Sequence, residues 1–325
     1  MTELVALGID LAKAKFDVRL AHQGKAKKKH FPNTAQGYAE LAAWLTHLGV
    51  GRVHACMEAT GTYGEALAEY LYGLGHTVSV VNPARIKGHA QSQLKRHKTD
   101  EVDAEVIRHF CATQHPEAWE PLKPEIKVLR SLLRRIDDLT AMQTQERNRL
   151  QAGMLPEAVQ TSVMQMLTYL ETQMADLQRQ IQAHLDQHPD LRQQVTLITS
   201  IPGLGPQTAT KLVAELQDIA GYADARSLAA SVGVTPAHYR SGSSVAGASH
   251  ISKVGNGPLR GALWWPAIAA MQHNPVIQTF VARLRQAKKH NFAIILAVIR
   301  KLLHLVYGVI KHKMPFDPHW TLSKA

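Results

Sequence analysis

The chain has 325 residues, of which 45% are hydrophobic, and carries a formal net charge of +11 from 37 Lys and Arg against 26 Asp and Glu. This hydrophobic fraction excludes wholesale disorder, and the length accommodates two domains with an extension between them. With only two cysteines, Cys56 and Cys111, a disulfide framework and a cysteine zinc site are excluded.

The excess of positive charge predicts a polyanionic partner, with nucleic acid first and an anionic membrane surface second. No apolar run approaches the roughly 20 residues of a membrane span, and the start "MTELVALGID" lacks a basic region followed by an apolar one. The sequence therefore predicts a cytoplasmic protein that does not cross a membrane.

The first 120 residues alternate between strand and helix patterns. Three strand patterns ("ELVALGI", "KFDVRLA", "KAKKKHFPN") come first, followed by the helix "AQGYAELAAWLTHLG", the strand "RVHACME", the helix "TYGEALAEYLYGLG", the strand "HTVSVVNP" and a helix beginning near Thr99. A three-strand meander followed by alternating helices and strands predicts a ribonuclease-H-like α/β domain over residues 1–120. Its sheet is expected to be partly parallel and covered on both faces.

Four acids stand where these strands end or where the last helix begins: Asp10, Glu58, Asp100 and Asp103. One acid at a helix start is explained by capping and the helix dipole. Asp100 and Asp103, however, are three residues apart and share a helix face, and the strand-end acids can reach the same sheet edge. Crowded carboxylates need a cation, and hard oxygen ligands select Mg²⁺ or Mn²⁺. A two-metal phosphodiester site is thus predicted.

Residues 121–194 have helical periodicity. In the second helix the apolar positions are spaced alternately by four and three residues, which is a heptad seam of nearly three repeats: Val163, Leu167, Leu170, Met174, Leu177 and Ile181. The pattern predicts a helical hairpin or an intermolecular coiled coil, with a packed intramolecular bundle as the alternative. The pair His184 and His188 in "HLDQH" lacks further ligands nearby, so a solvated helix face is favoured over zinc.

Residues 195–325 open with "LITSIPGLGPQTATKLVAEL". A helix, a turn with Gly203 and Gly205, and a second helix near Pro206 form the pattern of a helix-hairpin-helix, whose backbone N–H groups suit a DNA phosphate. A tight helix–helix turn without a ligand is the alternative. The loop "RSGSS" that follows holds Ser241, Ser243 and Ser244; on its own such a loop is usually only a loop.

Basic patches recur along the chain in "KAKKKH", "RIKGHAQSQLKRHK", "RSLLRR" and "RLRQAKKHN", with few aromatic residues between them. Such patches favour recognition of backbone and shape, and each alone is equally explained as a solvated face. The residues expected to contact nucleic acid are Lys95, Arg96, Lys98, Gly203, Gly205, Arg240 and Lys253.

Several ordered segments resemble the DEDD transposases of bacterial insertion sequences, also called bridge-RNA-guided recombinases: "GIDLAKAKFDV", "MEATGTY", "NPARIKGHAQSQLKRHKTDEVDA", "IPGLGPQTA", "GVTPAHYRSGSSVAG" and "ISKVGNGPLRGAL". The resemblance implies a RuvC-like domain whose four acids are Asp10, Glu58, Asp100 and Asp103, and a C-terminal transposase domain with a nucleophilic serine, here Ser241. It also implies target and donor DNA, a noncoding guide RNA, and a homo-oligomer of two to four subunits on the bacterial nucleoid.

The resemblance, taken with the four acids, implies a Mg²⁺-dependent, RNA-guided recombinase that exchanges DNA strands through a covalent phosphoserine at Ser241. A RuvC-like nuclease that resolves branched DNA with activated water, leaving Ser241 structural, is an alternative from the same fold. A non-catalytic DNA-binding protein is the alternative from another class, and the presence of all four acids argues against it.

Overall fold

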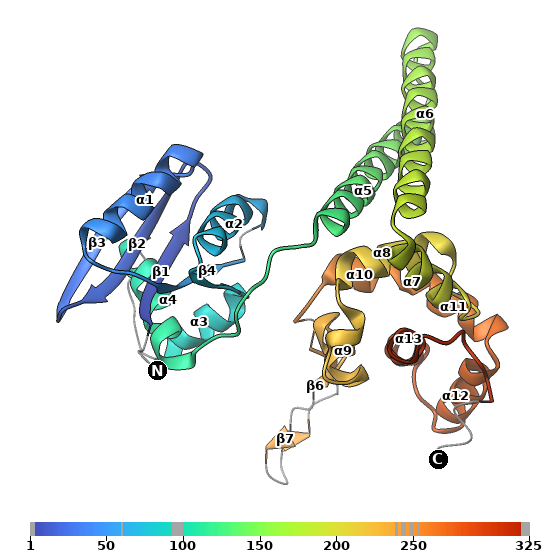
Figure 1. The fold of residues 1–325 in the computed structure, drawn as a ribbon. Coiled ribbons are helices and arrows are strands. Elements are labelled where there is room, and N and C mark those ends of the chain that lie inside the picture. The colour runs from blue at the N-terminus through green and yellow to red at the C-terminus, as the bar shows by residue number, and fades with distance from the viewer. Residues whose placement is uncertain are drawn as a thin grey trace. The chain divides into compact units, whose positions relative to one another are not determined.

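The computed structural model describes residues 4–59, 61–92, 100–237, 240–241, 245–246, 250–252 and 254–319. Contacts divide the chain into two compact units, Met1–Pro121 and Leu122–Ala325. The first is a mixed α/β unit and the second is mostly helical (Figure 1).

The first unit is built on one five-stranded sheet with strand order β3-β2-β1-β4-β5. Its strands are β1 (Val5–Leu11), β2 (Lys15–His22), β3 (Lys25–Pro32), β4 (Val53–Glu58) and β5 (Thr77–Val81). The first three strands are antiparallel neighbours, whereas β4 and β5 run parallel to β1. The predicted meander and the partly parallel sheet are therefore confirmed.

Helices cover both faces of this sheet. On one face, α1 (Ala35–His47) and α2 (Glu65–Gly73) bury Leu41, Leu45, Leu67 and Leu71 with the odd-numbered residues of β1. On the other, α3 (Pro83–Ser92) and α4 (Asp100–Gln114) pack on β4 and β5 through a smaller cluster that includes Cys56. The helix α3 was not predicted; it begins at a proline, and the Asn82 side chain accepts a hydrogen bond from the Ala84 amide.

The contact between β1 and α4 depends on a glycine. A Cβ added at Gly8 would lie 2.2 Å from the carbonyl oxygen of Ala104 and 2.3 Å from the backbone nitrogen of Arg108. Backbone atoms cannot move aside as a flexible side chain does. Any side chain at this position must therefore push α4 away from the sheet.

We expect Gly8→Ala to lower the free energy of unfolding by about 1–3 kcal/mol, the usual cost of forcing an extra methyl group into a packed core. Urea denaturation of the purified protein measures this difference. The matched control is Gly51→Ala, because a Cβ at Gly51 meets no heavy atom of the described chain within 4 Å. Equal stability of the two variants would contradict the close helix–strand contact.

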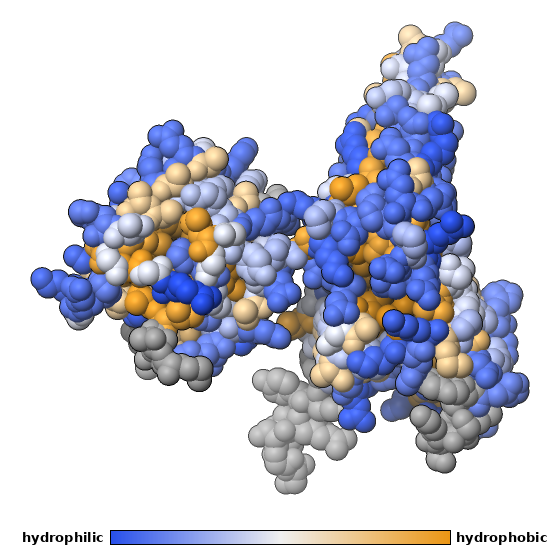
Figure 2. Space-filling view, viewed as in Figure 1, coloured by the Kyte–Doolittle hydropathy of each residue, from blue (hydrophilic) through white to orange (hydrophobic). Residues whose placement is uncertain are grey.

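The second unit begins with two long helices, α5 (Pro124–Gln151) and α6 (Glu157–Gln187), which form a hairpin. All six predicted seam residues of α6 are buried or half-buried. A buried amide, Gln143, donates to a carboxylate oxygen of Glu171 at 3.1 Å across the hairpin. The visible face of the hairpin is mostly hydrophilic, and hydrophobic residues gather near its base (Figure 2).

The rest of this unit is a helical bundle. Its helices are α7 (Pro189–Thr199), α8 (Pro206–Leu216), α9 (Ala225–Ser231), α10 (Gly257–Ala262), α11 (Trp264–His273), α12 (Pro275–Gln286) and α13 (Asn291–His312). They share one core with the base of the hairpin.

The helix α13 corrects one expectation from the sequence. With 22 residues and a mean hydropathy of 2.0 over its most apolar window, it is long and apolar enough to cross a membrane. Half of that window is buried inside the unit, and Leu302, Leu303 and Val306 are completely buried. These contacts are those of the core helix of a globular bundle, which explains why it is apolar on most sides.

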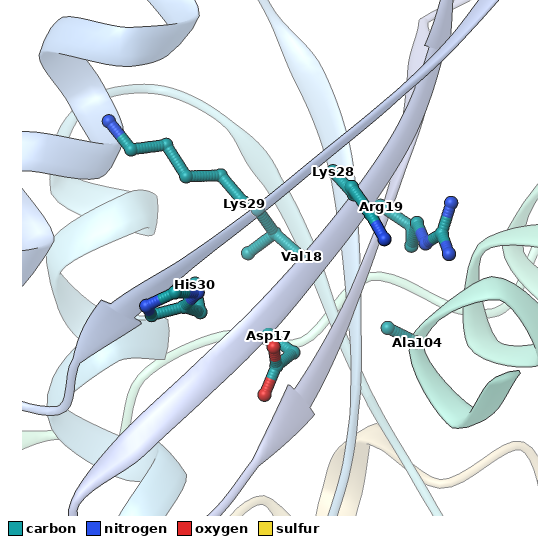
Figure 3. Close-up of a pocket in the computed structure, with 7 residues that line it drawn as sticks. All are labelled: Asp17, Val18, Arg19, Lys28, Lys29, His30 and Ala104. Atoms are coloured by element: carbon teal, nitrogen blue, oxygen red, sulfur yellow. The ribbon is translucent and has the colours of Figure 1, made fainter. Parts of the chain in front are cut away.

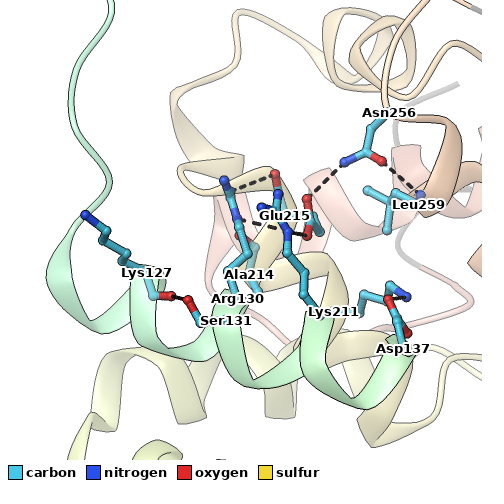
Figure 4. A network of polar contacts seen from close by, with 10 residues as sticks. Lys127, Arg130, Ser131, Asp137, Lys211, Ala214, Glu215, Asn256 and Leu259 are labelled. Atoms are coloured by element: carbon cyan, nitrogen blue, oxygen red, sulfur yellow. Dashed lines mark hydrogen bonds and ion pairs between the residues drawn. The ribbon is translucent and has the colours of Figure 1, made fainter. Parts of the chain in front are cut away.

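A polar network joins the hairpin to the bundle (Figure 4). The Arg130 guanidinium donates to the carbonyl oxygen of Ala214 at 2.8 and 3.0 Å and lies 4.0 Å from the Glu215 carboxylate. Glu215 also accepts from the Asn256 amide at 3.1 Å, and Asn256 caps the start of α10 through the Leu259 amide. One carboxylate therefore connects α5, α8 and the beginning of α10.

Candidate functional site

Asp10 and Glu58 are at the ends of two neighbouring parallel strands. Ile9 and Met57 are register partners between β1 and β4, so the residues that follow them, Asp10 and Glu58, stand next to each other at the same sheet edge. Both are half-buried. The sequence placed each acid at a strand end, and the parallel register brings the two together.

The face of the sheet that carries these two acids is the one beneath α4. Side chains alternate along a strand, so Asp10 shares the face of Gly8, which contacts Ala104, and Glu58 shares the face of Cys56, which packs against α4. The N-terminal end of β1 lies by the C-terminal half of α4, where Arg108, Cys111 and Ala112 line one pocket with Ala6. The first turn of α4 therefore lies toward Asp10.

That first turn holds the other two predicted acids. Asp103 is half-buried and immediately precedes Ala104, the residue that contacts Gly8. Asp100 is the first residue of α4, and its side chain lies outside the described part of the structure. Among the described residues, no group of three or more Asp, Glu, His or Cys side chains is arranged to hold a metal ion. The donors fit Mg²⁺ chemically, since all are carboxylates, although a closed ligand shell is not formed by the described side chains.

Cys56 lies two residues before Glu58 and is completely buried. Its hydrogen bond with Cys111 and its burial both raise the pKa of the Cys56 thiol. A thiol held neutral is a packing group rather than a metal ligand. The carboxylates, rather than the thiol, are thus the candidate metal ligands at this edge of the sheet.

A basic cavity of about 250 Å³ adjoins the acidic edge (Figure 3). It is lined by Asp17, Val18, Arg19, Lys28, Lys29, His30 and Ala104. Arg19 and Lys28 are register partners and lie side by side, whereas Lys29 extends the other way. Asp17 is the register partner of Asp10 and forms an ion pair with Lys15 at 3.2 Å. Cations beside a carboxylate group suit a phosphodiester, whose phosphate is negatively charged.

Sequence reasoning assigned "KAKKKH" to nucleic acid but missed Asp17 and Arg19. The alternation of β2 was the available signal, since residues 15, 17 and 19 share a face with Asp10 once β1 and β2 are paired.

Ser241 lies in a two-stranded ribbon rather than in an irregular loop, which corrects the sequence-based interpretation. The serine ribbon consists of two short antiparallel pairs among the described residues: β6 (Pro236–Ala237) with β9 (His250–Ile251), and β7 (Arg240–Ser241) with β8 (Val245–Ala246). Two backbone hydrogen bonds fix its base. The backbone N–H of Ser252 donates to the Thr235 carbonyl at 2.9 Å, and the backbone N–H of Asn256 donates to the Ser231 carbonyl. The side chains of Arg240 and Ser241 lie outside the described part, as do Ser243, Ser244 and Lys253 altogether.

The turn between α7 and α8 gives its two glycines different roles. Gly203 has a φ of +102°, and a Cβ there would come within 2.6 Å of the Ala270 backbone, so packing against α11 accounts for this glycine. Gly205 precedes α8 with an extended backbone, and the space where its Cβ would lie is open among the described atoms. A close approach of another molecule is therefore possible at Gly205 and not at Gly203.

The two histidines at the end of α6 make hydrogen bonds to backbone carbonyls. The His184 ring bonds to the Glu125 carbonyl at 2.8 Å, and the His188 ring bonds to the His184 carbonyl at 2.7 Å. The pair fastens the base of the hairpin, so the solvated face predicted for it is wrong. Lys95, Arg96 and Lys98 lie outside the described residues.

Comparison with known proteins agrees with this geometry. Residues 7–159 match the IS110 transposases of the DEDD type, and residues 195–282 match the family described as transposase IS116/IS110/IS902. The pilin gene-inverting protein of Moraxella bovis is 33% identical over 314 residues, covering 96% of this chain and 97% of that protein. Its namesake from Moraxella lacunata is equally similar.

The transposase for insertion sequence element IS1328 of Yersinia enterocolitica is 25% identical over 306 residues, which covers 84% of this chain and 85% of that protein. Both the end-to-end matches and the two family segments point the same way. The chain belongs to the IS110 family of transposases, enzymes that cleave and rejoin DNA.

Proposed function

We propose that this transposase is an RNA-guided recombinase that exchanges DNA strands through a covalent bond to Ser241, with Mg²⁺ held by Asp10, Glu58, Asp100 and Asp103. The observation that carries the proposal is the adjacency of Asp10 and Glu58 under the N-terminal turn of α4. Two neighbouring carboxylates at one sheet edge supply hard oxygen ligands of the kind that Mg²⁺ prefers.

The four carboxylates are proposed to hold one or two Mg²⁺ or Mn²⁺ ions. When bound, the metal neutralises charge on the phosphate and favours loss of a proton from the attacking hydroxyl. Arg19 and Lys28, in the cavity next to Asp10, are placed to contact the phosphate strand on its other side. The cavity and the acids together would position one phosphodiester at the carboxyl edge of the sheet.

The proposed covalent step uses the hydroxyl of Ser241. The bond between serine Oγ and phosphorus forms as one P–O bond of the DNA backbone breaks, and the released strand end takes up a proton. Attack on the phosphoserine by the hydroxyl end of a second strand restores Ser241 and joins the strands. No water enters either step, so the number of phosphodiester bonds is conserved.

The remaining assignments belong to the same proposal. We assign residues 1–120 to the catalytic RuvC-like domain, 121–194 to a coiled-coil region that assembles two to four subunits, and 195–325 to the transposase domain. The turn at Gly205 would bind a DNA phosphate as a helix-hairpin-helix. Recognition of target and donor DNA by a noncoding RNA rests on the resemblance of the ordered motifs, as does action in the cytoplasm on the bacterial nucleoid.

Reconstitution tests the proposal. Purified protein is combined with DNA carrying the insertion ends, Mg²⁺ and RNA transcribed from the DNA flanking the reading frame. We expect joined recombinant DNA only when all components are present, loss of product with EDTA, and recovery when Mg²⁺ or Mn²⁺ is restored. Full activity without RNA would contradict guidance, and full activity in EDTA would contradict the metal site.

A further inference from the structure

A long part of the second unit contains no acidic residue. Between Asp224 and Asp317 the sequence has no Asp or Glu, whereas Arg and Lys recur through the same stretch. Cations on α9 to α13 therefore have no acidic side chain within their own stretch to neutralise them. A surface of this kind attracts polyanions over a distance of about a Debye length.

The last turn of α12 and the segment that leads from it into α13 concentrate these cations. Arg285, Lys288 and Lys289 are all exposed, and every residue from 285 to 293 is exposed with them. Within the described part of the chain, none of the three takes part in an ion pair. The His290 ring caps α13 by accepting a hydrogen bond from the Phe292 amide at 3.3 Å, which fixes the end of the segment.

Two large exposed aromatic side chains belong to the N-terminal ends of α11 and α13. Trp265 on α11 is 74% exposed and Phe292 at the start of α13 is 56% exposed. The neighbouring Trp264 ring lies 5.2 Å from the Phe292 ring, centroid to centroid, so the N-terminal ends of α11 and α13 are in contact. Exposed aromatic rings on a basic surface are the combination that proteins use to bind single-stranded nucleic acid, because every base has a face on which a ring can stack.

We propose that Trp265, Phe292, Arg285, Lys288 and Lys289 form a binding surface for single-stranded DNA. Rings stack on the faces of unpaired bases, and the adjacent cations contact the phosphates of the same strand. A duplex buries its base faces and offers these rings no stacking partner. Cleavage and rejoining of DNA separate strands from their partners, so this enzyme meets unpaired bases during its reaction.

The proposal is independent of the serine chemistry and of RNA guidance, because it concerns affinity in the absence of reaction. Its measurement is therefore direct binding of the full-length protein to a labelled 20-nucleotide DNA strand, followed by fluorescence anisotropy in EDTA. The same strand as RNA, and the same sequence as duplex DNA, are measured in parallel. Loss of strand exchange by Ser241→Ala would leave this result unchanged.

We expect Trp265→Ala and Phe292→Ala each to weaken binding of single-stranded DNA about tenfold, the usual loss per stacked base. Trp265→Phe, which retains a ring, should recover most of that affinity, and duplex affinity should stay within about twofold of wild type. The matched control is Tyr72→Ala, because Tyr72 is also an exposed aromatic residue but belongs to the first unit. It should bind as wild type.

The salt dependence of binding distinguishes the contribution of the cations from that of the rings. For single strands, each phosphate contact contributes about 0.7 to the slope of log affinity against log salt concentration. The double variant Lys288→Ala/Lys289→Ala should therefore reduce that slope by about 1.4, whereas Trp265→Ala should leave it unchanged. Loss of slope in both variants would show that the rings do not stack.

Three outcomes would overturn the proposal. Equal losses on single-stranded and duplex DNA would show a backbone contact only, and a loss confined to RNA would assign the surface to RNA. If Trp265→Ala instead changed the molar mass in light scattering while DNA affinity stayed the same, the surface would join copies of the protein. Circular dichroism of each variant verifies that it is folded.

Discussion

Replacing Asp10 by Asn is expected to reduce DNA strand cleavage by at least about a hundredfold. Changes to groups that merely orient metal ligands cost 10- to 100-fold, so loss of a ligand charge should cost no less. The amide retains the shape of the side chain but removes its negative charge and its affinity for Mg²⁺. Because Asp10 is only half-buried, the free energy of unfolding should change little.

Glu40→Gln is the matched control, because it also exchanges a carboxylate for an amide. Glu40 is exposed on α1, which covers the sheet face opposite to the one that carries Asp10. Cleavage of the DNA substrate is quantified on denaturing gels at several Mg²⁺ concentrations for both variants. An equal loss in Glu40→Gln would contradict the assignment of the metal to the four predicted acids.

Ser241→Ala is expected to abolish strand exchange, with a loss of at least about a thousandfold, because removal of a nucleophile eliminates the covalent route. The diagnostic measurement is the protein–DNA adduct itself. When the wild-type reaction is stopped with denaturant, labelled DNA should remain attached to the polypeptide. Proteolysis should then locate the DNA on the peptide containing residue 241. The Ala variant should carry none while binding the DNA substrate with wild-type affinity.

Ser252→Ala serves as the comparison, since Ser252 follows the same ribbon and its backbone amide, rather than its hydroxyl, holds the base. It should form the adduct normally. Cleavage without any adduct in wild type would instead favour the RuvC-like nuclease, in which water is the nucleophile. An adduct that moves to Ser243 or Ser244 in the Ala variant would show that the ribbon supplies more than one usable hydroxyl.

The acidic edge was largely predictable because strand ends and helix starts leave clear local patterns. An apolar run ending in Asp10 and another ending in Glu58 fix each acid relative to its own strand. What the sequence alone does not contain is the parallel register that makes Ile9 and Met57 partners, since register is set by packing across the sheet. The position of α4 likewise depends on the contact at Gly8, which no pattern of periodicity reveals.

In the second unit, less of the structure was predictable from local sequence patterns. Heptad spacing identified the seam of α6, yet it does not distinguish the partner helix in the same chain from a second subunit. The "WW" of α11 resembles core sequence, and only the bundle shows that Trp264 faces inward while Trp265 is exposed. The Gly- and Ser-rich segment around Ser241 has too few apolar residues to predict strands, so its ribbon was missed.

The place of α13 in the chain has a consequence for synthesis on the ribosome. This helix supplies the centre of the second core and follows every other helix of that unit. Domains made early in translation fold first. The α/β unit is therefore complete while the bundle still waits for its last helix. A nascent chain thus holds its carboxylates in place well before it presents a folded support for Ser241, which delays competence for strand transfer until translation is nearly finished.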